Sequence, residues 1–233
     1  GQVWAATSAG LLLRFREGGY ENETRRTLQV PQAIRCLLCT SDGSVWLGYA
    51  GRGVGRLKDG QFRLYQQAQG LPEDYISQIV PDDRGRLWFA GNRGLFFVKQ
   101  KEFDVLDASS RSGGRGPRLH AVVLGANEGL PGTQASYGYW PAAMRGTDGK
   151  LWIPMQSGLA LVDAPNFQEN LLPPPVALER VVVDEQAINL DEFGESAVGA
   201  RAPATLAREN GQLRLRVQPG YQRLVFEFTA LSF

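Results

Sequence analysis

The residues that could do redox or metal chemistry are two cysteines and one histidine. Cys36 and Cys39 have the spacing of a dithiol motif. We expect the pair to lie in a strand, where residues three apart point to opposite faces, so a disulfide between them is disfavoured. Because His120 is the single histidine, cysteine and histidine cannot supply four zinc ligands within this sequence. We therefore predict two small buried cysteines, no metal and no cofactor.

Catalysis would also depend on His120, which lies in a predicted strand over 118–122. The sequence has no nucleophile elbow, phosphate-binding loop or metal-binding helix motif. The carboxylate pairs Glu73-Asp74 and Asp82-Asp83 fall in predicted turns, where acidic residues are common because they are well solvated. We therefore predict that the chain is not an enzyme.

Ligand recognition by stacking is a third kind of chemistry, indicated by an aromatic-rich segment over 136–141. The predicted ligand-binding residues are Tyr137, Tyr139, Trp140, Arg93, Asp74 and Tyr75. The three rings of the segment would stack on a sugar or another small molecule, and loops on a rigid scaffold often carry recognition. Arg93 would donate to an anion or a hydroxyl, with Asp74 and Tyr75 as polar neighbours. Alternatively, the rings pack the last repeat against the first or against the following domain.

The elements that must position these residues repeat along the first two thirds of the chain. An Asp-Gly turn is followed by a variable residue, an aliphatic residue and a tryptophan. The tryptophans of this box, including a truncated first copy, are Trp4, Trp46, Trp88 and Trp152. The first two intervals, from 4 to 46 and from 46 to 88, are both 42 residues, whereas the third is 64 residues. A fixed period of this length indicates a radially repeated all-β architecture.

Each repeat is predicted to contain four short strands, which in the second repeat fall within 34–40, 45–47, 54–58 and 61–65. Four-stranded units of this length match the blades of a β-propeller. We expect the tryptophan of each unit to fill the wedge between adjacent blades. The Gly-Leu-Pro turns lead into the first strands, which lie nearest the axis, so these turns should gather around one mouth of the channel.

The long third interval indicates an insertion before the last repeat. Residues 102–108 are a candidate short helix, and 109–116 are predicted to be a flexible basic loop. The aromatic segment lies further along the same enlarged repeat. Features particular to this chain are therefore expected here.

The Gly-Leu-Pro turn, the Asp-Gly-x-Leu-Trp box and the following Gly-Leu strand resemble the two-component regulator propeller repeats of bacterial sensor proteins. The enlarged last repeat, over 127–165, is similar to the final blade of that family. Residues 173–184 and 221–233 resemble the linker with first strand, and a further strand, of the triple-tyrosine domain that follows such propellers.

The resemblance implies an all-β fold with propeller blades of about 42 residues, followed by a partial immunoglobulin-like β-sandwich. The expected boundaries are a partial propeller over 1–168, a proline-rich linker over 169–176 and the N-terminal part of the triple-tyrosine domain over 177–233. Both modules are shorter than complete ones, which indicates an internal fragment of a larger receptor. An unpaired propeller edge at Gly1 predicts association with further blades or with a second copy as a homodimer.

The resemblance also implies a function. The chain would be the ligand-sensing region of a bacterial sensor or hybrid histidine kinase, on the periplasmic or extracellular side of the inner membrane. An unknown small molecule or oligosaccharide would rearrange the β-domain and signal to the receptor's other domains. One alternative is a secreted carbohydrate-binding or lyase-type propeller without a signalling partner. Another is a protein-interaction scaffold of the WD or kelch kind, whose Gly-His and Trp-Asp signatures are missing.

Composition agrees with these expectations. The 43% hydrophobic and 21% charged residues describe an ordinary globular chain, and 28 glycines with 13 prolines fit a turn-rich β protein. The net charge of +1 gives no broad electrostatic reason to bind nucleic acid. Without an apolar stretch of 18 or more residues, the sequence predicts no direct insertion into a membrane.

Overall fold

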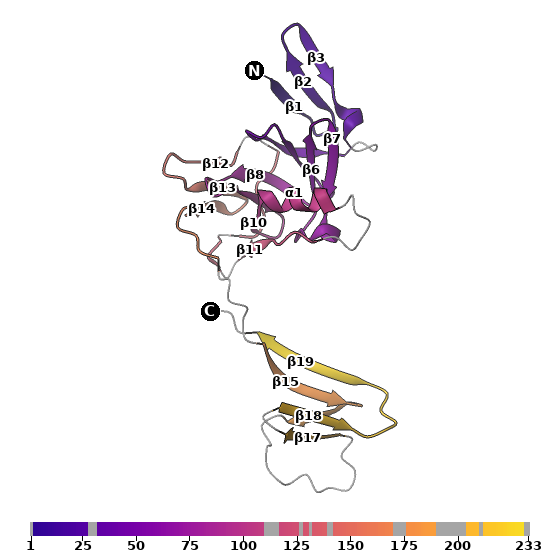
Figure 1. Cartoon of the computed structure of the whole chain (residues 1–233). Helices are drawn as coiled ribbons and strands as arrows, with labels where there is room; N and C mark the ends of the chain where they lie inside the picture. Colours follow the sequence, from indigo (N-terminus) through magenta and orange to yellow (C-terminus); the bar gives the residue numbers. More distant parts are fainter. Residues whose placement is uncertain are drawn as a thin grey trace. The chain divides into compact units, whose positions relative to one another are not determined.

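The computed structural model shows two compact units, Gly1–Glu169 and Asn170–Phe233 (Figure 1). The structure describes residues 2–27, 32–109, 117–125, 128–130, 132–138, 142–169, 176–189, 204–209 and 212–230. The predicted linker lies almost entirely outside these residues, as does the predicted basic loop except for Ser109. The identities predicted for the two units stay predictions.

The first unit consists mainly of antiparallel sheets. Its first sheet is β1 (Val3–Ala6), β2 (Leu12–Arg16) and β3 (Gly19–Asn22), and its second is β4 (Ile34–Cys39), β5 (Val45–Tyr49), β6 (Val54–Lys58) and β7 (Gln61–Tyr65). The third is β8 (Ile76–Pro81), β9 (Arg86–Gly91), β10 (Leu95–Lys99) and β11 (Val122–Leu124), and the fourth is β12 (Met144–Arg145), β13 (Leu151–Met155) and β14 (Gly158–Val162). Among the described residues, the 3₁₀ turns η1 (Thr24–Arg26) and η2 (Gln67–Gln69) and the helix α1 (Gln100–Ser109) accompany these sheets. Neighbours along each sheet are also neighbours in the sequence, so these sheets are simple meanders.

The tryptophans of the repeated box lie on corresponding strands, β1, β5, β9 and β13. Trp46 and Trp88 are fully buried, as the wedge prediction requires, but Trp152 is 38% exposed, so the prediction is wrong for the last repeat. The indole N–H groups of Trp46 and Trp88 donate to side-chain oxygens six positions upstream, on Thr40 and Asp82. The corresponding position before Trp152 is Gly146, which has no side-chain acceptor.

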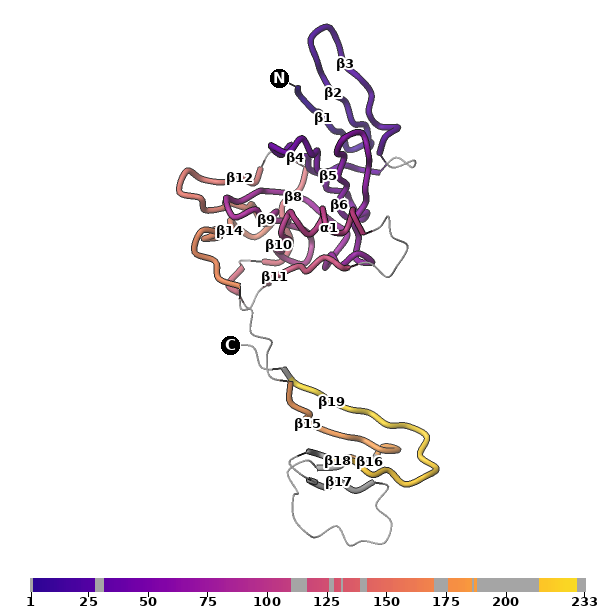
Figure 2. Tube along the Cα trace, in the orientation of Figure 1, coloured from indigo at the N-terminus to yellow at the C-terminus, as the bar shows by residue number. Residues whose placement is uncertain are grey.

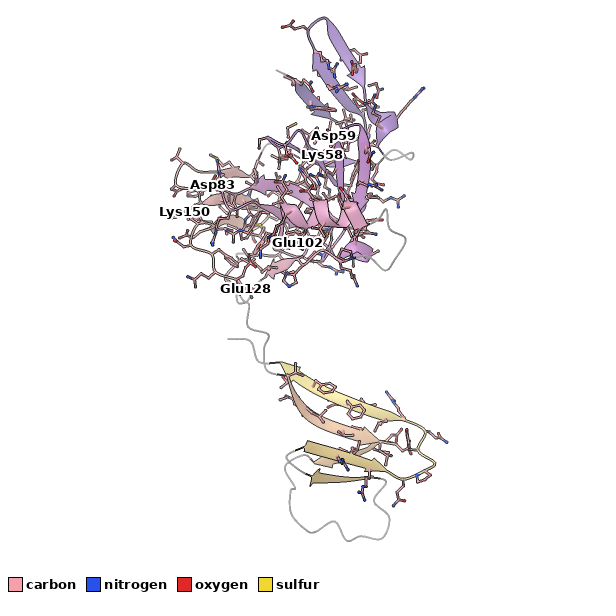
Figure 3. All side chains as sticks on the ribbon, viewed as in Figure 1. Lys58, Asp59, Asp83, Glu102, Glu128 and Lys150 are labelled. Atoms are coloured by element: carbon pink, nitrogen blue, oxygen red, sulfur yellow. The ribbon has the colours of Figure 1, made fainter. Side chains whose placement is uncertain are left out.

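The Asp-Gly turns join the first and second strands of the repeats, and their glycines adopt the left-handed conformation, with φ of +79° at Gly43 and +72° at Gly85. Glycine reaches this region without the penalty that a side chain brings. Turns of the third and fourth sheets lie beside each other, because Arg145 forms an ion pair with Asp83. Asp83 and Lys150 mark these turns in Figure 3. The repeated box thus sets the turns as well as the strands.

Helix α1 is longer than the predicted 102–108 and extends from β10 back to the second sheet (Figure 2). Its buried residues are Phe103 and Leu106. The Phe103 ring makes edge contacts with Trp46 and Tyr65, at centroid distances of 4.8 Å in both cases. The helix therefore packs against the second sheet, although in the sequence it lies between two strands of the third sheet.

Two predictions around cysteine and histidine need correction. Cys36 is buried, and burial raises the pKa of its thiol, but Cys39 is exposed because it lies at the end of β4. Both thiols are free. His120 precedes β11 rather than lying in a strand, and its backbone N–H donates to Glu102. Across the described ranges, no cluster of ligating side chains could hold a metal ion, and no helix is long and apolar enough to span a membrane.

The second unit contains two small sheets. One has the order β16 (Gln186–Asn189), β15 (Val176–Val183) and β19 (Leu224–Ala230), and the other pairs β17 (Ala204–Glu209) with β18 (Gln212–Val217). Val181 and Val183 are fully buried on the first sheet, with Leu215 and Val217 of the second packed against them. Apolar side chains of two sheets thus form one core.

Candidate ligand-binding site

In three successive repeats, the first strand or the segment that leads into it pairs with the tryptophan strand in the same register. Ile34, Ile76 and Ala135 each pair with the third residue after a repeat tryptophan, namely Tyr49, Gly91 and Met155 respectively. The next residue in each case is Arg35, Ser77 or Ser136. Since β4 also packs against β8, corresponding positions of different repeats are brought together.

Arg35 is the centre of the cluster that results. Its Nη1 donates to Ser77 Oγ at 3.2 Å. Its guanidinium carbon lies 4.4 Å from the ring centroid of Tyr137 and 5.4 Å from that of Tyr75, within the range of cation–π attraction. Three repeats therefore meet at one partly buried cation, and we call Arg35, Ser77, Tyr75 and Tyr137 the arginine–tyrosine cluster.

The two tyrosines keep accessible surface in this arrangement. Tyr75 is 45% exposed and Tyr137 is 49% exposed. Their rings offer apolar faces and hydroxyl tips, a combination suited to a ligand that has both apolar and hydrogen-bonding groups. The cluster can therefore stack a ligand as well as hold its polar groups.

A cavity of about 250 Å³ adjoins the same strand. It is lined by Ile34, Arg35, Cys36 and Leu37 of β4 and by Trp4, Ala5 and Ala6 of β1. The pairing partner of β1 within the described residues is β2, so the other edge of β1 borders this space. Arg35 thus belongs both to the cluster and to the wall of a cavity.

The predicted polar residues have different surroundings. The Asp74 carboxylate accepts the backbone N–H of Gln67 at 3.0 Å and also contacts its side-chain amide, which orders the chain around η2. Arg93 has an exposed side chain. The structure does not link either residue to the arginine–tyrosine cluster through a hydrogen bond, and Tyr139 and Trp140 lie outside the described residues.

The expectation that the Glu73-Asp74 pair is solvated is wrong for Glu73, because the side chain of Glu73 is buried. Its two carboxylate oxygens accept the backbone N–H groups of Asn92 and Arg93, at 2.8 and 2.9 Å. Burial raises the pKa of this carboxyl, and the two N–H donors offset part of that rise. Glu73 therefore fixes the turn that presents Arg93.

Sequence reasoning selected Tyr75 and Tyr137 but missed Arg35, Ser77 and Glu73. A signal for Arg35 is present in the repeat, since it precedes Ser77 by one interval of 42 residues. A long cation at a position where the next repeat has a small hydroxyl residue can reach across to the neighbouring sheet. The identity of its ring partners depends on packing.

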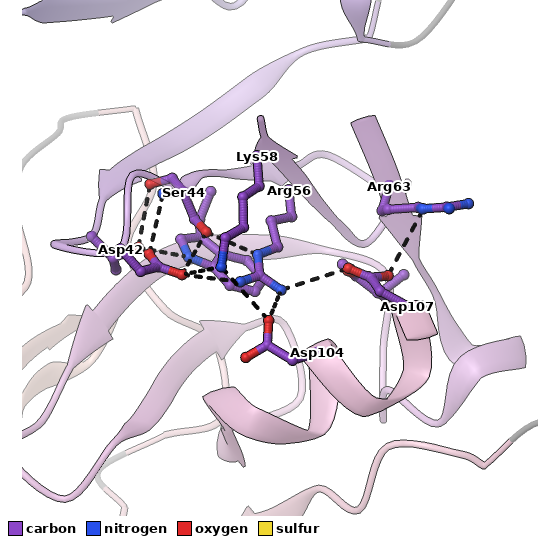
Figure 4. A network of polar contacts seen from close by, with 10 residues as sticks. Asp42, Ser44, Arg56, Lys58, Arg63, Asp104 and Asp107 are labelled. Carbon is purple, nitrogen blue, oxygen red and sulfur yellow. Dashed lines mark hydrogen bonds and ion pairs between the residues drawn. The ribbon is translucent and has the colours of Figure 1, made fainter. Parts of the chain in front are cut away.

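A second polar network lies around Arg56 on β6 (Figure 4). Unlike the guanidinium of Arg35, that of Arg56 is already paired with carboxylates. The guanidinium donates to Ser44, Asp42 and Asp104, at 3.0, 3.1 and 2.7 Å. Burial raises the pKa of Asp42, but hydrogen bonds from Thr40, Lys58 and Ser44 outweigh it and hold this pKa well below its usual range. A cavity of about 400 Å³ adjoins the network, but Arg56, the buried cation on its wall, already forms ion pairs with Asp42 and Asp104. We therefore assign the network a structural role.

Comparisons with known proteins agree with the repeat analysis. Residues 70–93 match the family model described as two component regulator propeller. A comparison with curated protein sequences found no match.

Two solved structures with a similar fold are extracellular domains of bacterial proteins. One is the extracellular domain of a protein from B. thetaiotaomicron described as a hybrid two component system, with a TM-score of 0.58 and 17% identity, covering 82% of this chain and 25% of that chain. Another, described as belonging to a one component system of the same organism, has a TM-score of 0.52 and 14% identity, covering 100% and 30%. The likeness to a virginiamycin B lyase from Staphylococcus aureus is weaker, with a TM-score of 0.47, 19% identity and coverage of 76% and 56%.

The chain spans 25% and 30% of the two extracellular domains that it resembles. At these identities the likeness concerns the fold alone. Residues 70–93 thus match a two component regulator propeller repeat, and the chain shares its fold with extracellular domains of proteins described as hybrid two component and one component systems.

Proposed function

We propose that this chain is an extracytoplasmic ligand-sensing region of a bacterial two-component receptor. In this proposal the first unit forms propeller blades, the second is the beginning of a triple-tyrosine β-sandwich, and the parent receptor is a sensor or hybrid histidine kinase. The observation that carries the sensing role is the arginine–tyrosine cluster, where Arg35 stacks on Tyr137 at 4.4 Å and on Tyr75 at 5.4 Å.

The cluster is suited to sensing because its residues come from three different sheets or from the segments that lead into them. A ligand held there would contact several repeats at once and would favour one arrangement of them over another. Unequal binding to two arrangements is the thermodynamic requirement for any ligand-driven switch. The ligand is proposed to be a small molecule or an oligosaccharide, with Arg93, Tyr139 and Trp140 as further contacts.

Ligand binding can be tested by a thermal-shift screen of glycans and small metabolites on the 233-residue chain. A ligand that binds the folded state raises the melting temperature by an amount that grows with the logarithm of its concentration relative to its Kd. We expect the shift produced by a hit to disappear in Tyr75→Ala and Tyr137→Ala. Tyr20→Ala is the matched control, because Tyr20 is 65% exposed on β3 and belongs to another sheet.

The result that would overturn the site is a hit whose shift stays unchanged in both tyrosine variants while those proteins keep the apo melting profile of the wild type. Signalling needs a separate measurement in the complete receptor. There, Tyr137→Ala should remove the ligand-dependent response of a transcriptional reporter and leave receptor abundance unchanged. A response that persists at full amplitude would exclude this cluster as the sensing site.

A further inference from the structure

Within the described residues, Arg35 forms no ion pair with a carboxylate, although its guanidinium packs on two tyrosine rings. Arginines that form ion pairs in the described parts of the chain are Arg14, Arg16, Arg26, Arg56, Arg63, Arg86, Arg145 and Arg180. The side-chain hydrogen bond of Arg35 is to the neutral hydroxyl of Ser77. A guanidinium that forms no ion pair keeps N–H donors that an anion can use.

Glu73 is the acidic residue near Arg35, but the two side chains do not form an ion pair. Glu73 is close enough for Arg35 and Arg93 each to lower its pKa through their charge, against the larger effect of burial. Its two oxygens, however, accept the backbone N–H groups of Asn92 and Arg93. Glu73 and Arg35 form no ion pair within the described residues, so the guanidinium keeps donors for another anion.

We infer that the arginine–tyrosine cluster binds a carboxylate-bearing saccharide, whose carboxylate pairs with Arg35 while a sugar face stacks on Tyr137 or Tyr75. This inference rests on the proposed function and adds the chemical class of the ligand. The planar guanidinium fork matches the two oxygens of a carboxylate. Exposed tyrosine rings supply the stacking surface that a saccharide uses and a simple carboxylate does not.

The charge balance of the site favours a carboxylate over a phosphate. The arginine–tyrosine cluster holds one cation, Arg35, and its other three members are neutral. A carboxylate brings one negative charge, whereas a phosphate monoester brings close to two. A singly charged acidic sugar therefore matches the cluster better than a sugar phosphate.

Calorimetric titration of the full chain with short hexuronate oligosaccharides tests the inference, with oligogalacturonate and oligomannuronate as the acidic probes. The methyl ester of each probe keeps the sugar ring but removes the charge. A hydrogen bond to a charged group contributes enough to give an affinity loss of about tenfold to a hundredfold when it is removed. We expect a loss of this size both for the ester on the wild type and for the acid on Arg35→Gln.

Two further variants separate charge from geometry and from folding. Arg35→Lys keeps the charge but loses the planar fork, so its affinity should lie between those of wild type and Arg35→Gln. Arg25→Gln is the matched control, because Arg25 is an exposed arginine in η1 and should leave affinity unchanged. Melting curves of the apo variants confirm that each protein is folded.

The outcomes distinguish the two proposals. If esters bind as tightly as acids, or Arg35→Gln binds as wild type does, the assignment of an acidic ligand is wrong. The proposed sensing function would survive that result provided that Tyr137→Ala still abolishes saccharide binding. Binding that no tyrosine variant affects would overturn both, and the absence of binding by every hexuronate probe would overturn the acidic class. A sugar phosphate that binds more tightly than the hexuronates would also overturn it.

Discussion

Arg56 and Asp104 lie 48 positions apart in the chain, yet the guanidinium Nη1 and the carboxylate Oδ1 are 2.7 Å apart. Arg56 belongs to the second sheet, and Asp104 belongs to the helix that lies between β10 and β11 of the third sheet. The same guanidinium contacts Asp42 at 3.1 Å and lies 4.8 Å above the ring of Trp46. One buried side chain therefore connects a repeat turn, its tryptophan and the inserted helix.

Arg56→Met should lower the free energy of unfolding of the first unit by about 2 kcal/mol, because the buried guanidinium loses its charge-assisted hydrogen bonds to Asp42 and Asp104, which are themselves 30% and 52% exposed. Asp42 and Asp104 would keep their charges with the ion-pair contacts to Lys58 alone, at 3.0 and 3.9 Å. Tryptophan fluorescence during urea unfolding reports on this unit, since all five tryptophans precede residue 170. Arg63→Met is the control, because Arg63 is 40% exposed and 4.0 Å from Asp107, and equal losses would refute the role of Arg56.

Phe103→Ala should destabilise the first unit by about 3 to 5 kcal/mol through loss of apolar contact and the cavity left behind. The ring is fully buried and touches both Trp46 and Tyr65. Val105→Ala on the same helix removes a 55% exposed side chain and should cost far less. The Trp46 contact also predicts a changed emission spectrum for folded Phe103→Ala. Indistinguishable denaturation midpoints for the two variants would show that α1 does not contribute to this core.

Asp82→Asn should destabilise the first unit in a way that depends on pH. Burial alone would raise the pKa of Asp82, but hydrogen bonds from Trp88, Arg86 and Arg84 lower it overall. Because the folded-state pKa lies below the ordinary value of 3.8, the ionised carboxylate stabilises the fold above about pH 3.8, and this contribution is lost as the pH falls further.

The expected loss for Asp82→Asn near neutral pH is about 3 kcal/mol, because its partner Arg86 is buried with it. Denaturant titrations between pH 7 and pH 3 should show the difference from wild type shrinking at the acidic end. Asp83→Asn, at an adjacent residue that is 69% exposed, should change stability by less than about 1 kcal/mol. A difference for Asp82→Asn that stays constant over this range would contradict the assigned charge interaction.

Gly70→Ala and Gly129→Ala compare the two Gly-Leu-Pro turns. Both glycines have positive φ, so alanine at either should cost about 1 kcal/mol or more in backbone strain. At Gly70 the added Cβ would also lie 2.3 Å from the backbone oxygen of Leu119, whereas at Gly129 it would meet nothing within 4 Å. Thermal unfolding should therefore show the larger decrease in Tm for Gly70→Ala, and the reverse order would mean that the contact with Leu119 is not maintained.

The sequence alone determined the repeat, the all-β class and the turns of the box. These features follow local rules, because strand alternation and left-handed glycines depend on residues that are neighbours in the chain. The box therefore predicted strands around Trp46 and Trp88 correctly. It could not predict the 38% exposure of Trp152, which depends on what packs against the last sheet.

Only the tertiary structure decided which side chains meet. Glu73 and Asp82 looked like solvated turn residues, but neighbouring chain segments bury both and give them donors. Tyr75 and Tyr137 were predicted from the sequence as ligand-binding residues, whereas their contacts with Arg35 were not predictable. Such contacts depend on how separate sheets pack, because the sequence spacing of residues far apart does not specify the distance between their side chains.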